Sequence, residues 1–97
     1  MKRATTLAAV VFSIAANAHA GSTLPKDVRA FVARRDVCDH FRGEFPDPPD
    51  PERVKEVNEN LEKYCKGTDA KLSQLKHRYA KKRDVMRKLN AYEETIE

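Results

Sequence analysis

The sequence predicts an all-α fold of three or four short helices, with one disulfide between the C-terminal ends of the first two helices and a proline-rich linker between them. Three observations lead to this prediction. Apolar residues recur at three- and four-residue intervals from residue 25 onward. The only two cysteines are Cys38 and Cys65, and four of the five prolines fall between residues 46 and 51. The chain shows no strand-like alternation, internal repeat or glycine-rich loop.

The first twenty residues have the pattern of a secretory signal peptide. Lys2 and Arg3 supply positive charge, residues 7–16 are apolar apart from one serine, and Ala18 and Ala20 form the small-x-small cleavage pattern. An uncleaved anchor is the alternative, but the apolar run is shorter than the about 20 residues that span a bilayer. We therefore expect cleavage after Ala20 and a periplasmic or secreted protein.

Cleavage would leave a single small helical domain, residues 21–97, in an oxidising compartment. A domain of 77 residues has a thin core, and two cysteines in such a compartment are normally paired. Closing this loop contributes about 3.5 kcal/mol in the chain-entropy model, which is comparable to the net stability of many small domains. We therefore expect a disulfide between Cys38 and Cys65.

A first helix is predicted over residues 25–42. Pro25 suits a first helical turn and Gly43 suits a helix end. Its buried stripe is expected to contain Val28, Phe31, Val32, Cys38 and Phe41, together with the aliphatic stem of Arg35.

A proline-rich linker over residues 43–50 precedes a second helix over residues 51–66. The prolines favour polyproline II over helix or sheet. Their PxxP spacing leaves a docking ligand as the alternative to a linker. Asp50 is a good N-cap and Pro51 a good first helical residue, and Gly67 closes the helix.

The C-terminal part is predicted as two short helices, 68–80 and 84–94, with one kinked helix as the alternative. Thr68 is the expected cap of the first and Asp84 of the second, because the apolar spacing is interrupted at residues 81–83.

The disulfide implies a path for the linker. Both cysteines lie in about the last turn of their helices, and a disulfide needs Cα atoms less than about 7 Å apart. Eight residues of polyproline travel about 25 Å, and the second helix returns over nearly the same distance. The linker should therefore run antiparallel to the second helix and help to cover it.

Charge is strongly segregated along the chain. Loss of the signal peptide removes Lys2 and Arg3, which lowers the formal net charge from +4 to +2. Residues 44–62 contain seven acidic side chains and two basic ones, whereas residues 71–88 contain eight basic side chains and one acidic one. The sequence therefore predicts an acidic middle and a basic C-terminal part.

The first helix carries a dense polar face around Cys38. Asp36 and His40 are four residues apart, as a metal pair or an acid–base pair would require. A protein metal site usually needs three or four ligands. Cys38 and His40 point about 200° apart on a helix, so they do not form the nucleophile–base pair of a cysteine enzyme. We therefore expect a structural disulfide, no metal or cofactor, and a solvated, salt-linked face. Its candidate binding residues are Arg35, Asp36, Asp39, His40 and Arg42.

The basic run contains a second candidate surface at Lys81, Lys82 and Arg83. These cations suit anionic polymers or lipids, with salt-sensitive binding, although an ordinary solvated helix face accounts for the same residues. Nucleic acid is not an expected partner, because the mature net charge is small and Tyr79 is the only aromatic residue within the run.

Two segments carry a resemblance to known proteins. Residues 34–44, RRDVCDHFRGE, and residues 64–70, YCKGTDA, followed by Leu72 and Leu75, resemble small exported helical proteins of proteobacteria. Those proteins remain uncharacterised, so the resemblance carries no activity with it. A cysteine followed by a Leu/Tyr helical stripe is also similar to lysozyme-inhibitor-like periplasmic proteins, which usually have more cysteines.

The functional hypothesis is a periplasmic binding or inhibitor module that is not an enzyme. No catalytic, metal or nucleotide motif is present in the sequence, and the small stapled scaffold separates its charges strongly. The expected partner is an envelope protein, such as a wall-degrading enzyme. The alternative is binding of anionic envelope polymers or lipid through residues 71–88.

Overall fold

The computed structural model describes residues 24–97, and the predicted signal peptide lies outside the described residues. This part of the chain is helical and contains no strand, which confirms the all-α prediction. None of the described helices is long and apolar enough to cross a membrane. The helices are α2 (Lys26–Arg42), α3 (Pro51–Cys65), α4 (Thr68–Arg78) and α5 (Arg83–Leu89).

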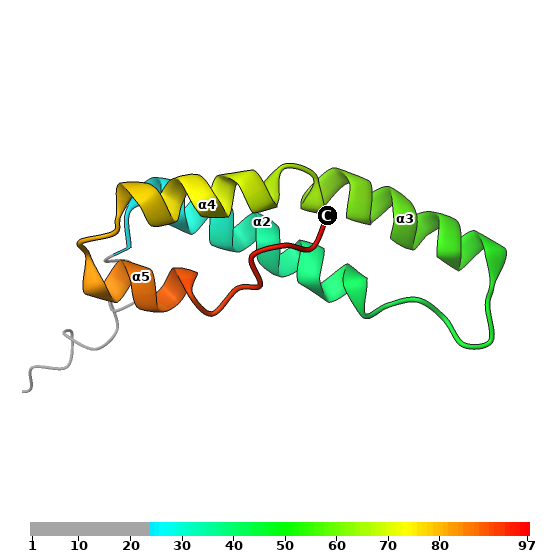
Figure 1. Ribbon diagram of the computed structural model, residues 1–97. Helices are drawn as coiled ribbons and strands as arrows, with labels where there is room; N and C mark the ends of the chain where they lie inside the picture. The colour runs from blue at the N-terminus through cyan, green and yellow to red at the C-terminus, as the bar shows by residue number, and fades with distance from the viewer. Residues whose placement is uncertain (1–23) are drawn as a thin grey trace, which may run out of the picture.

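The helices form an elongated molecule (Figure 1). α3 and α4 follow one another along roughly one line and run antiparallel to α2, and α5 turns back beside α4. The C-terminal part of α2 therefore contacts the end of α3, and the rest of α2 lies along α4. The C-terminal end of the chain lies close to the junction of α3 and α4.

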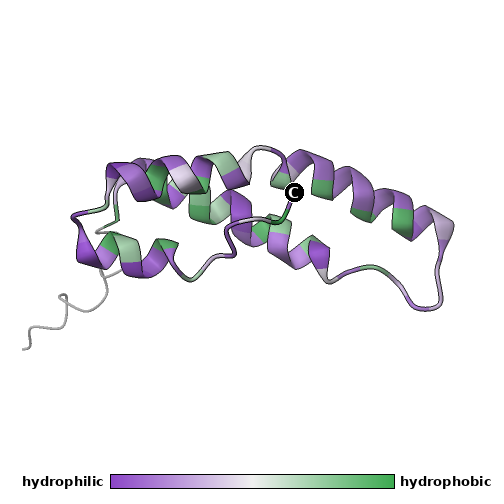
Figure 2. Cartoon of the chain, viewed as in Figure 1, coloured by the Kyte–Doolittle hydropathy of each residue, from purple (hydrophilic) through white to green (hydrophobic). Residues whose placement is uncertain are grey.

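The hydrophobic core lies between α2, α4 and α5. The hydrophobic residues of α4 and α5 lie on the sides of these helices that face each other (Figure 2). Tyr92 completes the core, with its ring edge-on to Phe31 at a centroid distance of 5.4 Å. Burial of each aliphatic side chain contributes about 1.5–3 kcal/mol. The buried residues of this cluster are Val28, Phe31, Leu72, Leu75, Val85 and Leu89.

The disulfide joins α2 to the end of α3, as predicted. Cys38 is fully buried, and the Cα atoms of Cys38 and Cys65 are 4.9 Å apart. Gly67 has a φ of 82°, a left-handed conformation that glycine adopts without a steric cost. This conformation lets the chain pass from α3 to α4 through only two non-helical residues.

Residues 43–65 form a projecting arm, made of the linker and α3 (Figure 1). The linker runs back along α3, in agreement with the path inferred from the disulfide. Glu44 accepts a hydrogen bond from Arg53 at 3.2 Å, and Val57 is fully buried although it lies outside the main core cluster. Asp50 caps α3 by accepting a hydrogen bond from the backbone N–H of Glu52. The Glu44–Arg53 ion pair joins the linker to α3, whereas coverage of the helix by the linker stays a prediction.

The ends of the last two helices differ from the prediction. α4 ends at Arg78, two residues early, and its N-cap is Gly67 instead of Thr68. α5 begins after Lys82, so Asp84 is not the N-cap, and it ends at Leu89 instead of residue 94. The helix stops because residues 92–97 turn away to contact α2 and α4, and these contacts outweigh the helical spacing of the sequence.

Candidate functional site

Arg35 is the most deeply buried charged side chain among residues 24–97, with no exposed surface. Its guanidinium donates to Thr68 Oγ1 at 3.3 Å and to the backbone carbonyl of Glu93 at 2.6 Å. It also lies 3.4 Å from a carboxylate oxygen of Asp39 and 3.4 Å from one of Asp69. The aliphatic stem of Arg35 is buried, as predicted. The expectation that its charged group is solvated is wrong, because the guanidinium links α2, α4 and the C-terminal segment.

Asp69 holds the tail to the start of α4. Its carboxylate accepts hydrogen bonds from the backbone N–H groups of Ile96 and Glu97, both at 2.9 Å, and Glu97 Oε1 accepts from the Asp69 N–H at 3.1 Å. Burial alone would raise the pKa of Asp69, but these N–H groups and the charge of Arg35 outweigh it and hold the pKa below its usual value. We call Arg35, Asp69 and the tail segment 93–97 the latch.

The other candidates on α2 also have partners within the protein. Asp36 accepts a hydrogen bond from the Tyr92 hydroxyl at 2.7 Å. Burial raises the pKa of the Tyr92 hydroxyl, and the hydrogen bond to Asp36 raises it further. Asp39 forms an ion pair with Arg35 and another with Arg42. These residues of α2 therefore support the fold.

Two further contacts account for the remaining candidates on α2. Arg42 pairs with Glu93 at 3.3 Å, and this bond is the main reason that the pKa of Arg42 is raised. His40 Nε2 lies 3.5 Å from Glu44 Oε1. Asp36 and His40 thus have separate partners, and residues 24–97 contain no group of three potential metal ligands.

The arm presents a different kind of surface. Phe45 is 48% exposed and is the one large hydrophobic side chain exposed among residues 24–97. Glu44 and Asp47 flank it in the sequence. Along α3, a shallow hollow of about 670 Å³ is lined by Pro51, Val54, Lys55, Asn58, Glu59 and Glu62. The arm therefore combines exposed apolar surface with acidic side chains.

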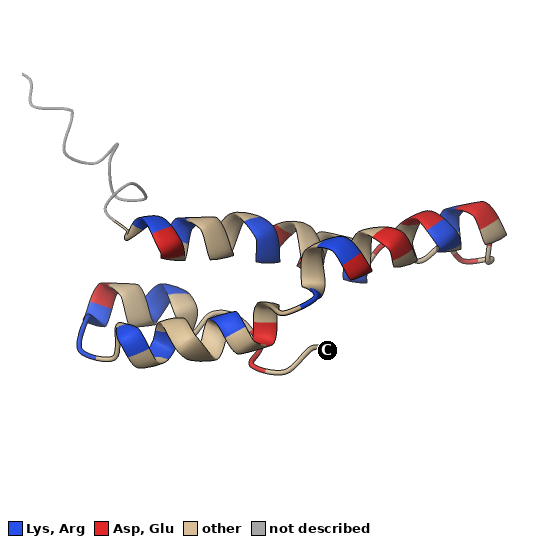
Figure 3. Cartoon of the chain, turned by 90° about the horizontal axis from the view of Figure 1, so that it is seen from above, with Lys and Arg blue, Asp and Glu red and all other residues tan. Residues whose placement is uncertain are grey.

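Lys81, Lys82 and Arg83 lie at the turn between α4 and α5 and are exposed. In the part of the chain that the structure describes, these three side chains form no ion pair, and we call them the basic end. Figure 3 shows basic residues gathered around this turn and acidic ones along α3. A hollow of about 300 Å³ lies beside the turn, with Leu24, Pro25, Tyr79 and Val85 in its lining.

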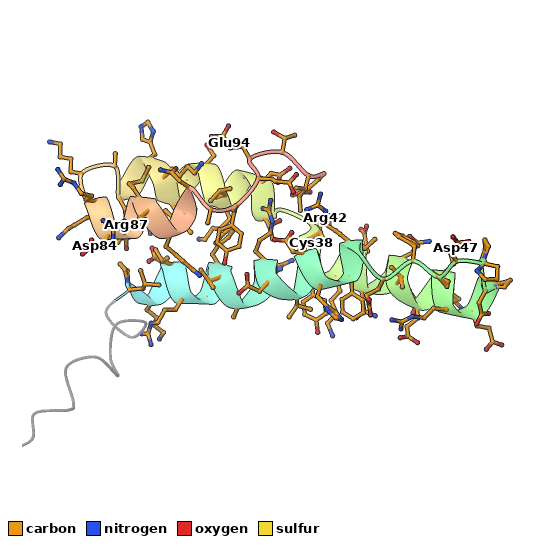
Figure 4. The ribbon with its side chains drawn as sticks, turned by 90° about the horizontal axis from the view of Figure 1, so that it is seen from below. Cys38, Arg42, Asp47, Asp84, Arg87 and Glu94 are labelled. Carbon is orange, nitrogen blue, oxygen red and sulfur yellow. A yellow bond between two sulfur atoms is a disulfide. The ribbon has the colours of Figure 1, made fainter. Side chains whose placement is uncertain are left out.

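Comparison with known proteins finds no family model, curated protein or solved structure that matches this chain. The site is therefore described by its own geometry. Of the residues predicted from the sequence, the structure brings Arg35, Asp39 and Arg42 together in one network, and the basic end lies apart from it. Figure 4 places Arg42 near mid-length and Asp84, close to the basic end, at one extremity.

Sequence reasoning missed Asp69, Glu93 and Phe45. In sequence, Asp69 is an acid in the first turn of a helix, which is an ordinary place for a carboxylate, and the Glu93 carbonyl gives no sequence signal at all. Phe45 could have been found, because an aromatic residue in a linker of prolines and acids has few places to be buried.

We expect the carboxylate of Asp27 to make stability depend on pH. A hydrogen bond from the Tyr79 hydroxyl at 2.8 Å is the main cause that lowers the pKa of Asp27, and Arg78 adds to it against an opposing effect of burial. A carboxyl whose pKa is depressed on folding stabilises the fold above its unfolded pKa of about 3.9. This stabilisation is lost as the pH falls through the folded pKa.

Denaturant titrations at pH values from about 6 down to 2 measure this effect. The free energy of unfolding of the wild type should fall more steeply below about pH 5 than that of Asp27→Asn. Asp84→Asn is the control, because Asp84 is exposed and its one ion pair within residues 24–97 is with Arg87, at 3.5 Å. Equal slopes for the wild type and Asp27→Asn would contradict the assignment.

Proposed function

We propose that the protein is an exported, non-catalytic binding or inhibitor module of the periplasm, and that the arm is its docking element. The observation that carries this proposal is Phe45, which is 48% exposed on an acidic arm that projects from the core. A singly exposed hydrophobic side chain is common on protein surfaces, but an aromatic residue on a projecting arm matches the anchors that often dominate the binding energy of protein interfaces. The engagement of Asp36, Asp39 and His40 in internal pairs supports a structural role for α2.

The partner that suits this surface is an envelope protein with basic side chains around an apolar pocket. Residues 44–62 carry seven acidic side chains and two basic ones, and complementary charge speeds encounter and selects partners. A wall-degrading enzyme is the first partner to test, because a cysteine followed by a Leu/Tyr helical stripe resembles lysozyme-inhibitor-like periplasmic proteins; the comparisons do not bear on this resemblance. Mass spectrometry of the periplasmic fraction tests export, with a chain beginning at Gly21 as the expected result.

The experiment compares the wild type with Phe45→Ala and with the double variant Asp47→Lys, Glu52→Lys. Immobilised wild-type protein should retain an envelope protein and inhibit a purified wall-degrading enzyme, and both variants should reduce this binding by about tenfold or more. Asp84→Lys is the matched control, because it reverses an exposed acid at the opposite extremity. The proposal fails if nothing is retained or inhibited, or if the arm variants bind as well as the control.

Binding of an anionic polymer or lipid is the second candidate function. The observation that favours it is the basic end, three exposed cations that form no ion pair within residues 24–97. Such binding should fade between low and physiological salt, because it rests on screened charge. Vesicles of anionic lipid, or lipopolysaccharide, are the probes.

The variant Lys81→Glu, Lys82→Glu should abolish vesicle binding. The variant Lys63→Glu, Lys71→Glu should retain it, because it changes the net charge equally at exposed lysines away from the basic end. Equal loss in both variants would show that only net charge matters, and it would remove the basic end as a specific site.

A further inference from the structure

The two extremities of the molecule carry opposite charge. Asp47 lies at the tip of the arm, and Asp84 and Arg87 lie at the other extremity (Figure 4). Acidic side chains outnumber basic ones by seven to two in residues 44–62, and basic ones outnumber acidic ones by eight to one in residues 71–88. The acidic arm of one copy should therefore attract the basic C-terminal part of another copy.

The two extremities are also complementary in shape. The arm offers a knob, the exposed ring of Phe45, between Glu44 and Asp47 in the sequence. The opposite extremity offers a socket, the hollow of about 300 Å³, which is within the size range of small ligand pockets. Its apolar lining is Leu24, Pro25, Tyr79 and Val85, and its polar lining is Lys82, Arg83 and Asp84.

The acid in the socket does not cancel its positive character. Asp84 is paired with Arg87 at 3.5 Å, whereas Lys82 and Arg83 form no ion pair within residues 24–97.

On the arm, Glu44 is paired with Arg53 and His40, so the acidic surface beside Phe45 is carried by Asp47 and the acids of α3. An aromatic ring on an acidic arm is thus complementary in charge and polarity to an apolar hollow beside free cations.

We infer that a second copy of this chain occupies the socket, with the arm of one molecule seated on the basic end of the next. A two-fold dimer that pairs arm with arm would place like charges together, so the contact pairs the arm of one copy with the basic end of another. This pairing is reciprocal in an antiparallel two-fold dimer, which closes on two copies, and one-sided in a head-to-tail arrangement, which produces open chains; the size of the complexes in sedimentation distinguishes the two. The inference does not depend on the proposed envelope partner, but a protein that binds the arm would have to displace the neighbouring copy.

The contact is expected to be weak and sensitive to salt. Exposed charges lose most of their attraction once the Debye length falls from about 30 Å at 0.01 M salt to about 3 Å at 1 M. Phe45 supplies the part of the contact that salt does not screen, because burial of its ring removes apolar surface from water. Association should therefore increase with protein concentration at low salt and decrease at high salt.

Sedimentation velocity of the purified protein alone tests the inference over a range of concentrations at 0.01 M and 1 M salt. We expect concentration-dependent association at low salt, and about a tenfold weaker association for Phe45→Ala. The variant Arg29→Glu, Lys66→Glu should associate like the wild type, because it makes the same change in net charge as reversal of two basic-end lysines, at exposed residues outside both the arm and residues 71–88. A wild type that is monomeric at every concentration and salt would overturn the inference.

Mixing two charge-reversed variants gives the decisive result. The arm variant Asp47→Lys, Glu52→Lys and the basic-end variant Lys81→Glu, Lys82→Glu should each be monomeric alone and should form mixed complexes together, because the mixture restores opposite charges at the contact. Association of either variant alone at wild-type strength would overturn the contact between arm and basic end. Vesicle binding by a protein that stays monomeric would assign the basic end to lipid and also overturn it. Retention of an envelope partner is measured separately, so the proposed function can fail or succeed independently.

Discussion

Loss of the Cys38–Cys65 disulfide is expected to cost about 3.5 kcal/mol of unfolding free energy. The bond closes a loop with a sequence separation of 27 residues, and the chain outside it adds only a small core. At about 4–8 °C per kcal/mol for a domain of this size, the melting temperature should fall by about 15 °C or more. The double variant Cys38→Ala, Cys65→Ala and reduction of the wild type should give the same loss in denaturant titrations.

The reductant supplies the control for this prediction. It should change the stability of the wild type and leave that of the double alanine variant unchanged, since the variant has no bond to reduce. Protein recovered from the periplasm should contain no free thiol. A wild type that keeps its full stability after verified reduction would show that the arm and the core hold together without the bond.

Substitution of Arg35 by methionine should destabilise the protein by about 3–5 kcal/mol. The change keeps an unbranched apolar stem, but it leaves the carboxylate of Asp69 and the carbonyl of Glu93 without their buried partner. Arg35→Lys should not restore stability, because a single ammonium cannot reach Thr68 and Glu93 as the planar guanidinium does. Both losses are measured as shifts in the denaturant midpoint.

Arg29→Met is the matched control for Arg35. Arg29 lies on the same helix, is exposed and forms no ion pair among residues 24–97, so its substitution should stay within about 0.5 kcal/mol. Hydrogen exchange adds a local readout, because Arg35→Met should remove protection from the amides of Ile96 and Glu97 first. Equal stability of the two methionine variants would contradict the role of Arg35.

The helices could be predicted because local signals agree with the fold. Asp50 and Pro51 mark the start of α3 within one residue, and the two cysteines alone give the return path of the linker. The end of α5 could not be predicted, because Tyr92 has the spacing of a helical core residue. It packs on Phe31 from a turn instead, since the following backbone must reach Arg35.

The candidate sites were predictable only in part. The basic end followed from a run of three cations at a break in the helical spacing, and it is exposed as expected. The polar face of α2 was harder to predict. All five candidates are polar residues on one helix, and the sequence does not show that Arg35 alone among them is fully buried. Which arginine is buried depends on Asp69 and Glu93, which lie 34 and 58 residues further along the chain.

The latch also constrains the order in which this protein can acquire its structure. Arg35 belongs to the earliest described helix, yet the groups that satisfy it arrive with residues 68–69 and with residue 93. A chain delivered from its N-terminus must therefore leave that cation in water until residue 93 has emerged. Arrival of the segment around Glu93, rather than formation of α2 itself, is then the event that allows Arg35 to be buried.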